Sequence, residues 1–145
     1  MRSLDGQVAL VTGASRGIGA GIAVELAEQG AYVIGTATSD AGASATAETL
    51  GGVGHGYVYD AALPESAAQL LKTLSDAGQS PTILVNNAAI NRDTLLLRMT
   101  DDDWTQVIDT NLTGVFRLTR GCLRAMVKAR HGRIINLTSI VGVMG

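Results

Sequence analysis

A glycine-rich turn near the start of the chain has the residue types and the spacing of a phosphate-binding loop. Residues 12–19 read TGASRGIG, between an apolar run and a segment of helical period. A turn from a strand to a helix directs backbone N–H groups and the positive helix end toward one spot, which suits a pyrophosphate. The spacing GxxxGxG is a variant of the dinucleotide fingerprint GxGxxG, and an ordinary glycine-rich turn is the alternative.

The three glycines of this turn have different expected roles. Gly13 allows the tight turn, Gly17 lets the backbone approach the phosphates, and Gly19 lets the helix pack closely on the sheet.

The charges beside the turn indicate which dinucleotide it binds. A site for NAD typically carries an acid at the end of the second strand, whereas the 2′-phosphate of NADP needs cationic or hydroxyl donors. Residues 35–39 read GTATS, and the first acid is Asp40. Arg16 lies inside the glycine turn and offers a planar set of donors within reach of such a phosphate. The alternative is that Arg16 is a solvated loop residue.

Four more polar residues stand where strands end or inside a helix. Asp60, Asn87 and Ser139 each end or follow an apolar run. Ligands bind at the carboxyl edge of open α/β sheets, so Asn87 is expected there. The structural alternatives are a strand-ending acid for Asp60, a backbone-binding amide for Asn87 and a turn residue for Ser139. Asn111 lies within a helical segment, where a packing kink competes with a catalytic role.

Alternating strands and helices must position these residues. Short β-branched runs without strict polar alternation are typical of buried strands. They cover residues 7–12, 31–36, 56–60, 82–87 and 133–138. Because helical segments separate them, right-handed crossovers predict a doubly wound, Rossmann-like α/β parallel sheet in a single domain.

The first two helices have clear signals. The first places Ile18, Ile22 and Leu26 on one face and stops at Gly30, a C′ glycine. The second covers about residues 40–50.

A third helix is expected after Pro64 and extends as far as Gly78. Another is expected to begin at Thr100, whose hydroxyl is the predicted N-cap of the segment TDDDW. A long helix then ends before Gly132. Its apolar residues, spaced at three and four, are Leu112, Val115, Phe116, Leu123, Met126 and Val127.

Composition excludes several classes of protein. With 145 residues, 46% hydrophobic and 17% charged, the chain is no disordered tail. A formal net charge of −2 without a basic block gives no bulk attraction to nucleic acid or an anionic membrane. The apolar run VALV is too short for a signal peptide, and no run reaches membrane-span length. The single cysteine, Cys122, is expected to be a buried thiol. We expect the protein to be cytoplasmic. No metal site is predicted.

Several motifs together resemble the short-chain dehydrogenase/reductase family. They are TGASRGIG, NNAA, the Asn of NLTGVF, and GRIINLTSIVGVMG. Within the family, the stretches VIGTATS, NRDTLLLRM and RHGRIINLTSIVG are most similar to the bacterial 3-oxoacyl-[acyl-carrier-protein] reductases of fatty-acid elongation. This resemblance implies NADP(H) as cofactor, a substrate carried by acyl carrier protein, and a homotetramer built through helices in 101–131.

The resemblance also implies roles for single residues. Arg16 and Thr38 would bind the 2′-phosphate, Asp60 the adenine amino group, and Asn111 a water in a proton relay. Ser139 would hydrogen-bond the substrate carbonyl. The full set of expected cofactor-binding residues is Gly13, Ala14, Ser15, Arg16, Gly17, Ile18, Gly19, Thr38, Asp60, Asn87 and Ala88.

One family motif is missing from the sequence. The general acid of the family is the Tyr of YxxxK, but the residues four beyond Tyr32, Tyr57 and Tyr59 are Thr, Ala and Leu. We therefore expect residues 1–145 to form one NADP-binding domain that lacks the C-terminal part of the family fold and is inactive alone. The alternatives are a non-catalytic nucleotide- or partner-binding half-domain, or a family reductase of another carbonyl substrate.

Overall fold

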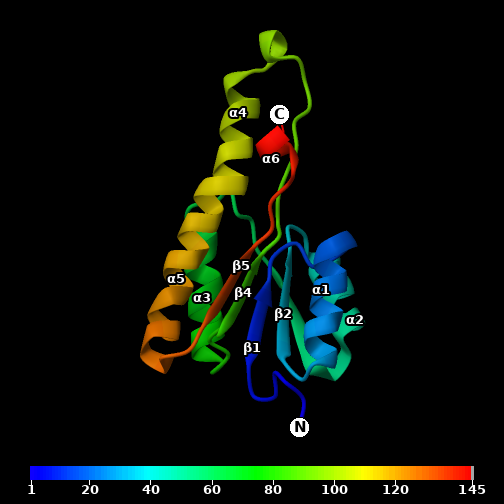
Figure 1. The fold of residues 1–145 in the computed structure, drawn as a ribbon, viewed down its shortest axis with the longest axis vertical. Coiled ribbons are helices and arrows are strands. Elements are labelled where there is room, and N and C mark those ends of the chain that lie inside the picture. The colour runs from blue at the N-terminus through cyan, green and yellow to red at the C-terminus, as the bar shows by residue number, and fades with distance from the viewer. Residues whose placement is uncertain (145) are drawn as a thin grey trace.

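The computed structural model describes residues 1–144 and contains one five-stranded parallel sheet between two layers of helices (Figure 1). The strands are β1 (Val8–Val11), β2 (Tyr32–Ala37), β3 (Gly54–Val58), β4 (Ile83–Asn86) and β5 (Arg133–Asn136). Their order is β3-β2-β1-β4-β5, and every neighbouring pair is parallel. The predicted Rossmann-like fold is confirmed. Strand order reverses at β1, and ligands bind beyond the carboxyl ends of the strands at such a point.

The helices lie on both faces of the sheet. They are α1 (Gly17–Glu28), α2 (Asp40–Leu50), α3 (Ser66–Asp76), α4 (Asp101–Ile108), α5 (Gly114–Ala129) and α6 (Val141–Met144), with short turns η1 (Gly51–Val53), η2 (Leu96–Arg98) and η3 (Asp109–Thr113). Figure 1 shows α1 and α2 on one face and α3 and α5 on the other. Within residues 1–144, no helix is both long and apolar enough to cross a membrane.

Each face of the sheet has its own core because side chains alternate along every strand. Leu10 of β1 packs in the cluster that includes Leu74 of α3 and Leu118 of α5. Its neighbours Ala9 and Val11 point to the opposite face, into the cluster that includes Ala23 and Ala27 of α1. β1 is therefore buried on both sides, as its continuous apolar sequence predicts.

The packed face of α1 agrees with the prediction at Ile22 and Leu26, which pack against the core, and differs from it at Ile18. Ile18 is 69% exposed, and the buried residues are Gly19, Ala23 and Ala27. These three small residues recur every four positions, so the backbone of α1 lies close to the sheet and the larger Ile18 points away. The expected end of the helix is confirmed, since Gly30 has φ +102° and its N–H donates to Ala27 O at 3.0 Å.

The predicted long helix is interrupted. It begins at the expected cap, where Thr100 Oγ1 accepts from Asp103 N–H at 3.1 Å and Asp103 accepts in return from Thr100 N–H. Between α4 and α5, however, η3 is a π-helical turn. This turn contains Asn111, where a packing kink was one of the two interpretations of the sequence.

The apolar residues of this helix do not all face the core. Of the six named above, Met126 alone is buried, beside Leu118 and Cys122. Leu112, Phe116, Leu123 and Val127 are exposed and form a stripe along one side. The buried thiol expected at Cys122 is confirmed, and burial raises the pKa of that thiol to about 12.

Candidate functional site

The glycine turn joins the end of β1 to α1 through left-handed backbone at two positions. Gly13 has φ +66° and Gly17 has φ +57°, a region that glycine adopts without steric cost. The Gly13 N–H donates to Thr36 Oγ1 of β2 at 3.4 Å, which holds the turn against the sheet. A Cβ on Gly17 would meet no atom within 4 Å. The space beside Gly17 is therefore open to a ligand.

Gly19 fits closely against the same turn. A Cβ at this position would overlap the Gly13 carbonyl oxygen and lie 2.5 Å from Asn87 Nδ2. That amide nitrogen donates to Thr12 O at 3.0 Å and to Gly13 O at 3.1 Å. Gly19 was expected to let the helix pack closely on the sheet. The atoms that lie closest to Gly19 belong to the glycine turn and to Asn87. Asn87 thus binds backbone, as one of its two interpretations predicts.

Thr12 is a structural residue of the site that sequence reasoning missed. Its Oγ1 accepts from the N–H groups of Asn87 and Ala88, at 3.0 and 2.9 Å. Thr12 is only 2% exposed, and these bonds join the carboxyl ends of β1 and β4. The available signal was a hydroxyl at the last position of the first apolar run, directly before a glycine.

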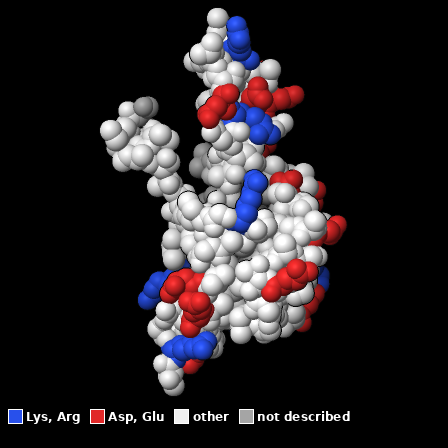
Figure 2. Space-filling model, turned by 90° about the vertical axis from the view of Figure 1, so that its right-hand side faces the viewer, with Lys and Arg blue, Asp and Glu red and all other residues white. Residues whose placement is uncertain are grey.

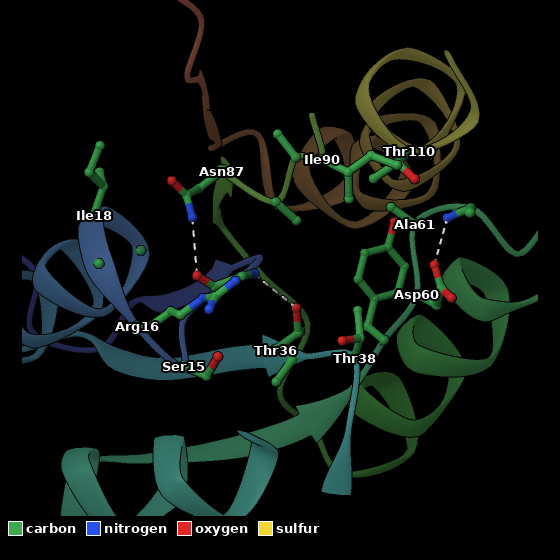
Figure 3. Close-up of a pocket in the computed structure, with 18 of the residues that line it drawn as sticks. Ser15, Arg16, Ile18, Thr36, Thr38, Asp60, Ala61, Asn87, Ile90 and Thr110 are labelled. Carbon is green, nitrogen blue, oxygen red and sulfur yellow. Dashed lines mark hydrogen bonds between the residues drawn. The ribbon is translucent and has the colours of Figure 1, made fainter. Parts of the chain in front are cut away.

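A cavity of about 780 Å³ opens at this edge of the sheet, between the glycine turn and the ends of β2, β3 and β4 (Figure 3). Ten of the eleven expected cofactor-binding residues line it. They are Gly13, Ser15, Arg16, Gly17, Ile18, Gly19, Thr38, Asp60, Asn87 and Ala88. The exception is Ala14, whose side chain lies in the core and whose N–H donates to Thr36 O at 2.8 Å. The exposed Ile18 is thus part of the cavity wall.

The β2 side of the cavity carries no acid. Thr36, Ala37 and Thr38 line it there. Figure 3 shows Arg16 and Ser15 on the glycine turn and Thr36 and Thr38 at the end of β2. Within residues 1–144 the only ion pair joins Lys72 to Asp76. The Arg16 guanidinium is therefore not paired with a described carboxylate and is available to an anionic ligand.

The far end of the cavity carries a carboxylate and a buried phenol. Asp60 Oδ1 accepts from Ala62 N–H at 2.9 Å, so this acid serves the turn and also faces the cavity (Figure 3). Tyr59 is 3% exposed, and burial together with the negative charge of Asp60 raises the pKa of its hydroxyl to about 12. Because an efficient general acid has a pKa near the working pH, Tyr59 is a poor candidate for that role.

Asn111 lies in the π-helical turn η3 and hydrogen-bonds the backbone of Ile90, a residue of the cavity wall. Its Oδ1 accepts from Ile90 N–H at 2.8 Å, and its Nδ2 donates to Ile90 O at 2.8 Å. Ile90 lines the cavity, whereas Asn111 does not. Both polar atoms of this amide therefore serve the backbone that continues from β4.

Ser139 is not brought to the cavity in this structure. It is exposed, and its Oγ accepts from Val141 N–H at 3.3 Å, in keeping with the turn-serine alternative. The segment after β5 leads into α6, and Figure 2 shows it as an uncharged projection apart from the charged projection that contains α4.

The fold and the site together define a class of protein. An open parallel sheet whose strand order reverses at β1, with a GxxxGxG turn over a cavity at that edge, is the arrangement of a dinucleotide-binding oxidoreductase. In agreement, the family model for short chain dehydrogenases matches residues 7–145. The chain therefore belongs to the short chain dehydrogenase family.

Curated relatives narrow the comparison. The chain is 56% identical over 146 residues to 3-oxoacyl-[acyl-carrier-protein] reductase FabG of Pseudomonas aeruginosa. It is 54% identical over 143 residues to FabG of Vibrio cholerae and 51% identical over 143 residues to FabG of Escherichia coli. Each alignment covers 99% of this chain and 59% of the relative. The chain thus spans about three fifths of the length of these proteins.

Proposed function

We propose that this protein is an NADPH-dependent reductase that converts a 3-oxoacyl thioester on acyl carrier protein to the 3-hydroxyacyl thioester. The substrate class is supported by relatives of 51% to 56% identity whose printed names state that activity. The choice of cofactor rests on one observation. The end of β2 that lines the cavity carries no acid, and Arg16 lines the same cavity without an ion pair to any carboxylate of residues 1–144.

The residues of the cavity fit NADPH. The turn leaves open space beside Gly17, where a pyrophosphate can meet backbone N–H groups. In this proposal Arg16 and Thr38 bind the 2′-phosphate, and Asp60 accepts from the adenine amino group. Asn87 and Thr12 keep the turn in shape through their bonds to it and to β4.

The chemistry proposed is hydride transfer to a ketone. When bound, NADPH supplies the hydride that the carbonyl carbon receives. The carbonyl oxygen then needs a hydrogen-bond donor and finally a proton. On the family resemblance we assign the donor role to Ser139, although it lies outside the cavity in this structure. We assign a positioning role to Asn111, which acts through Ile90. A serine hydroxyl is too weak an acid for the final protonation, and no tyrosine in this sequence belongs to a YxxxK motif.

The cofactor assignment is tested by titrating the intact protein with NADPH and with NADH. Loss of one charge-assisted hydrogen bond costs about 1.5–3 kcal/mol, so Arg16→Ala should weaken NADPH binding roughly 10- to 150-fold and leave NADH nearly unchanged. Arg98→Ala removes the same charge from an exposed residue outside the cavity and serves as control. Equal losses of affinity for the two cofactors would show that Arg16 does not bind the 2′-phosphate.

Turnover separates the enzyme from the alternatives. NADPH consumption with an acetoacetyl thioester supports the proposed reductase. Nucleotide binding without turnover on any carbonyl supports a binding module, and turnover confined to other ketones supports a different reductase of the family. For residues 1–145 alone we expect binding with little turnover, because a positioned general acid contributes about 10²–10⁴-fold.

We further propose a homotetramer in the cytoplasm, assembled through residues 101–131. The exposed stripe of Leu112, Phe116, Leu123 and Val127 supports this surface as an interface. Light scattering that shows a monomer at all micromolar concentrations would contradict it.

A further inference from the structure

A polar cluster joins the carboxyl ends of β4 and β5 to helix α5. Asn86, the last residue of β4, is 5% exposed. Its Nδ2 donates to Asn136 Oδ1 at 2.8 Å and to Thr119 Oγ1 at 3.2 Å. Asn136 is the last residue of β5, and Thr119 lies in α5. Because an amide nitrogen carries two hydrogens, both donors of Asn86 are used, one toward each neighbouring element.

β5 depends on such contacts because little packing holds it. All four residues of β5 are exposed, whereas all four residues of β4 are buried. The parallel ladder places Asn136 opposite Asn86, and the Leu137 N–H donates to Asn86 O at 3.0 Å. The Leu137 side chain packs against the core on the α1 side. The end of β5 is therefore held by Asn136 toward α5 and by Leu137 toward α1.

These two residues are the last fixed point before Ser139. Ser139 follows Asn136 by three residues, so the two Cα atoms lie within about 11 Å of each other. Among the described residues, the hydrogen bonds of 138–144 are all local to that segment, such as the one from Gly142 N–H to Ser139 O at 3.1 Å. The direction in which this segment leaves the sheet (Figure 1) is therefore set at Asn136 and Leu137.

We propose that Asn136, held by Asn86, is a positioning residue that directs the segment carrying Ser139. This inference rests on the proposed function, in which Ser139 donates a hydrogen bond to the carbonyl of the substrate. Such a donor must be held within about 0.5 Å of its productive position, so a loose strand end is costly to the reaction.

The kinetic signature of this role differs from that of a cofactor contact. Asn136 does not line the cavity, so its loss should leave NADPH binding unchanged. A hydrogen bond to the carbonyl oxygen strengthens as negative charge develops there, so a misplaced Ser139 should lower kcat.

The test compares two replacements of Asn136 in the intact protein. Asn136→Leu removes the acceptor at similar size, whereas Asn136→Asp keeps an oxygen for Asn86 Nδ2 at an exposed position. With an acetoacetyl thioester, Asn136→Leu should lower kcat at least about tenfold and leave the dissociation constant of NADPH unchanged. Asn136→Ala should behave as Asn136→Leu does, and Asn136→Asp should retain most of the kcat.

Hydrogen exchange measures the same effect without substrate. The backbone amides of residues 137–140 should exchange faster in Asn136→Leu than in the unaltered protein, and at the unaltered rate in Asn136→Asp. Faster exchange without a loss of kcat would show that the contact is only structural, and would overturn the inference.

The control is Gln7→Leu, the same change from amide to leucine at the amino end of the sheet. Gln7 Oε1 accepts from Thr82 Oγ1 at 3.4 Å and lies 3.0 Å from His131 Nε2, and Gln7 does not line the cavity. Gln7→Leu should lower the urea midpoint of unfolding, as Asn136→Leu does, but keep the kcat of the unaltered protein.

Two results overturn the inference and leave the proposed reductase intact. One is a kcat of Asn136→Leu equal to that of Gln7→Leu, and the other is an equal loss of kcat in Asn136→Leu and Asn136→Asp. If the unaltered protein reduces no ketone, the proposed function itself is wrong and the inference is overturned with it.

Discussion

Replacing Gly19 by alanine tests whether the glycine turn and Asn87 form one unit. The added Cβ would overlap the Gly13 carbonyl oxygen and lie 2.5 Å from Asn87 Nδ2. The Asn87 amide would have to move, and it would lose its bonds to the carbonyl oxygens of Thr12 and Gly13. Gly21→Ala is a matched control, because it adds a methyl to the same helix where no atom lies within 4 Å.

The two substitutions should change the free energy of unfolding in opposite directions. Two lost hydrogen bonds cost about 1 kcal/mol each, and overpacking adds about 1–3 kcal/mol. Alanine in place of a helical glycine stabilises the helix by about 1 kcal/mol, which offsets part of this loss. Gly19→Ala should therefore lower the free energy of unfolding by about 2–4 kcal/mol, whereas Gly21→Ala should raise it by about 0.5–1 kcal/mol.

Urea unfolding followed by circular dichroism measures both changes, and dinucleotide titration measures the effect on the site. Gly19→Ala should also weaken NADPH binding, since the turn that faces the cavity is displaced. If Gly19→Ala were as stable as Gly21→Ala and bound NADPH equally well, the proposed packing of Asn87 against this helix would be refuted.

Three further predictions concern single side chains. The raised pKa of the Cys122 thiol, about 12, means roughly 10³-fold less thiolate than in an exposed cysteine, so a thiol reagent at pH 8 should react slowly with folded protein and quickly in urea. Hydrogen bonds from Thr100 lower the pKa of the Asp103 carboxyl below 3.8, so its contribution to stability is present above pH 3.8 and is lost as the pH falls through the lower, folded value. Asp103→Asn should flatten that part of a urea midpoint against pH profile, and an unchanged profile would contradict the capping role. Asn111→Ala removes both bonds to Ile90 and should weaken NADPH binding by about tenfold, whereas Asn91→Ala, which removes an exposed amide, should not.

The sequence predicted the order of strands and helices well because short continuous apolar runs mark strands and a helical period marks the segments between them. The expected burial of the run at 133–138 was wrong, since β5 is exposed along its length. The second helix was expected at about 40–50 and is found at Asp40–Leu50, and the cap at Thr100 was recognised from its acidic first turn. The first helix shows where this reasoning fails in part, since Ile22 and Leu26 pack against the core but Ile18 does not. Periodicity marks large apolar residues, so it selected Ile18, whereas the close approach of α1 to the sheet depends on small ones such as Ala23.

The site was predictable where chemistry is local and less so where it depends on partners distant in the chain. The glycine spacing marks one turn, and ten of the eleven expected cofactor-binding residues, six of them in that turn, line one cavity. The bonds of Thr12 to Asn87 join residues 75 positions apart, and no local pattern reports them. The π-helical turn at Asn111 was foreseen only as a possible kink at a mid-helix asparagine, because a single extra residue barely changes a helical period.

The central position of β1 has a consequence for synthesis of the chain on the ribosome. β1 pairs on one side with β2, which follows it closely, but on the other side with β4, which starts at Ile83. About 45 residues lie between the end of β2 and that start, and at about 5–20 residues per second their synthesis takes roughly 2–9 s. During this interval the Val8–Val11 strand, fully apolar, has an unpaired backbone edge that can join another strand. Until β4 has been synthesised, the edge of β1 is therefore open to pairing with a strand of another chain.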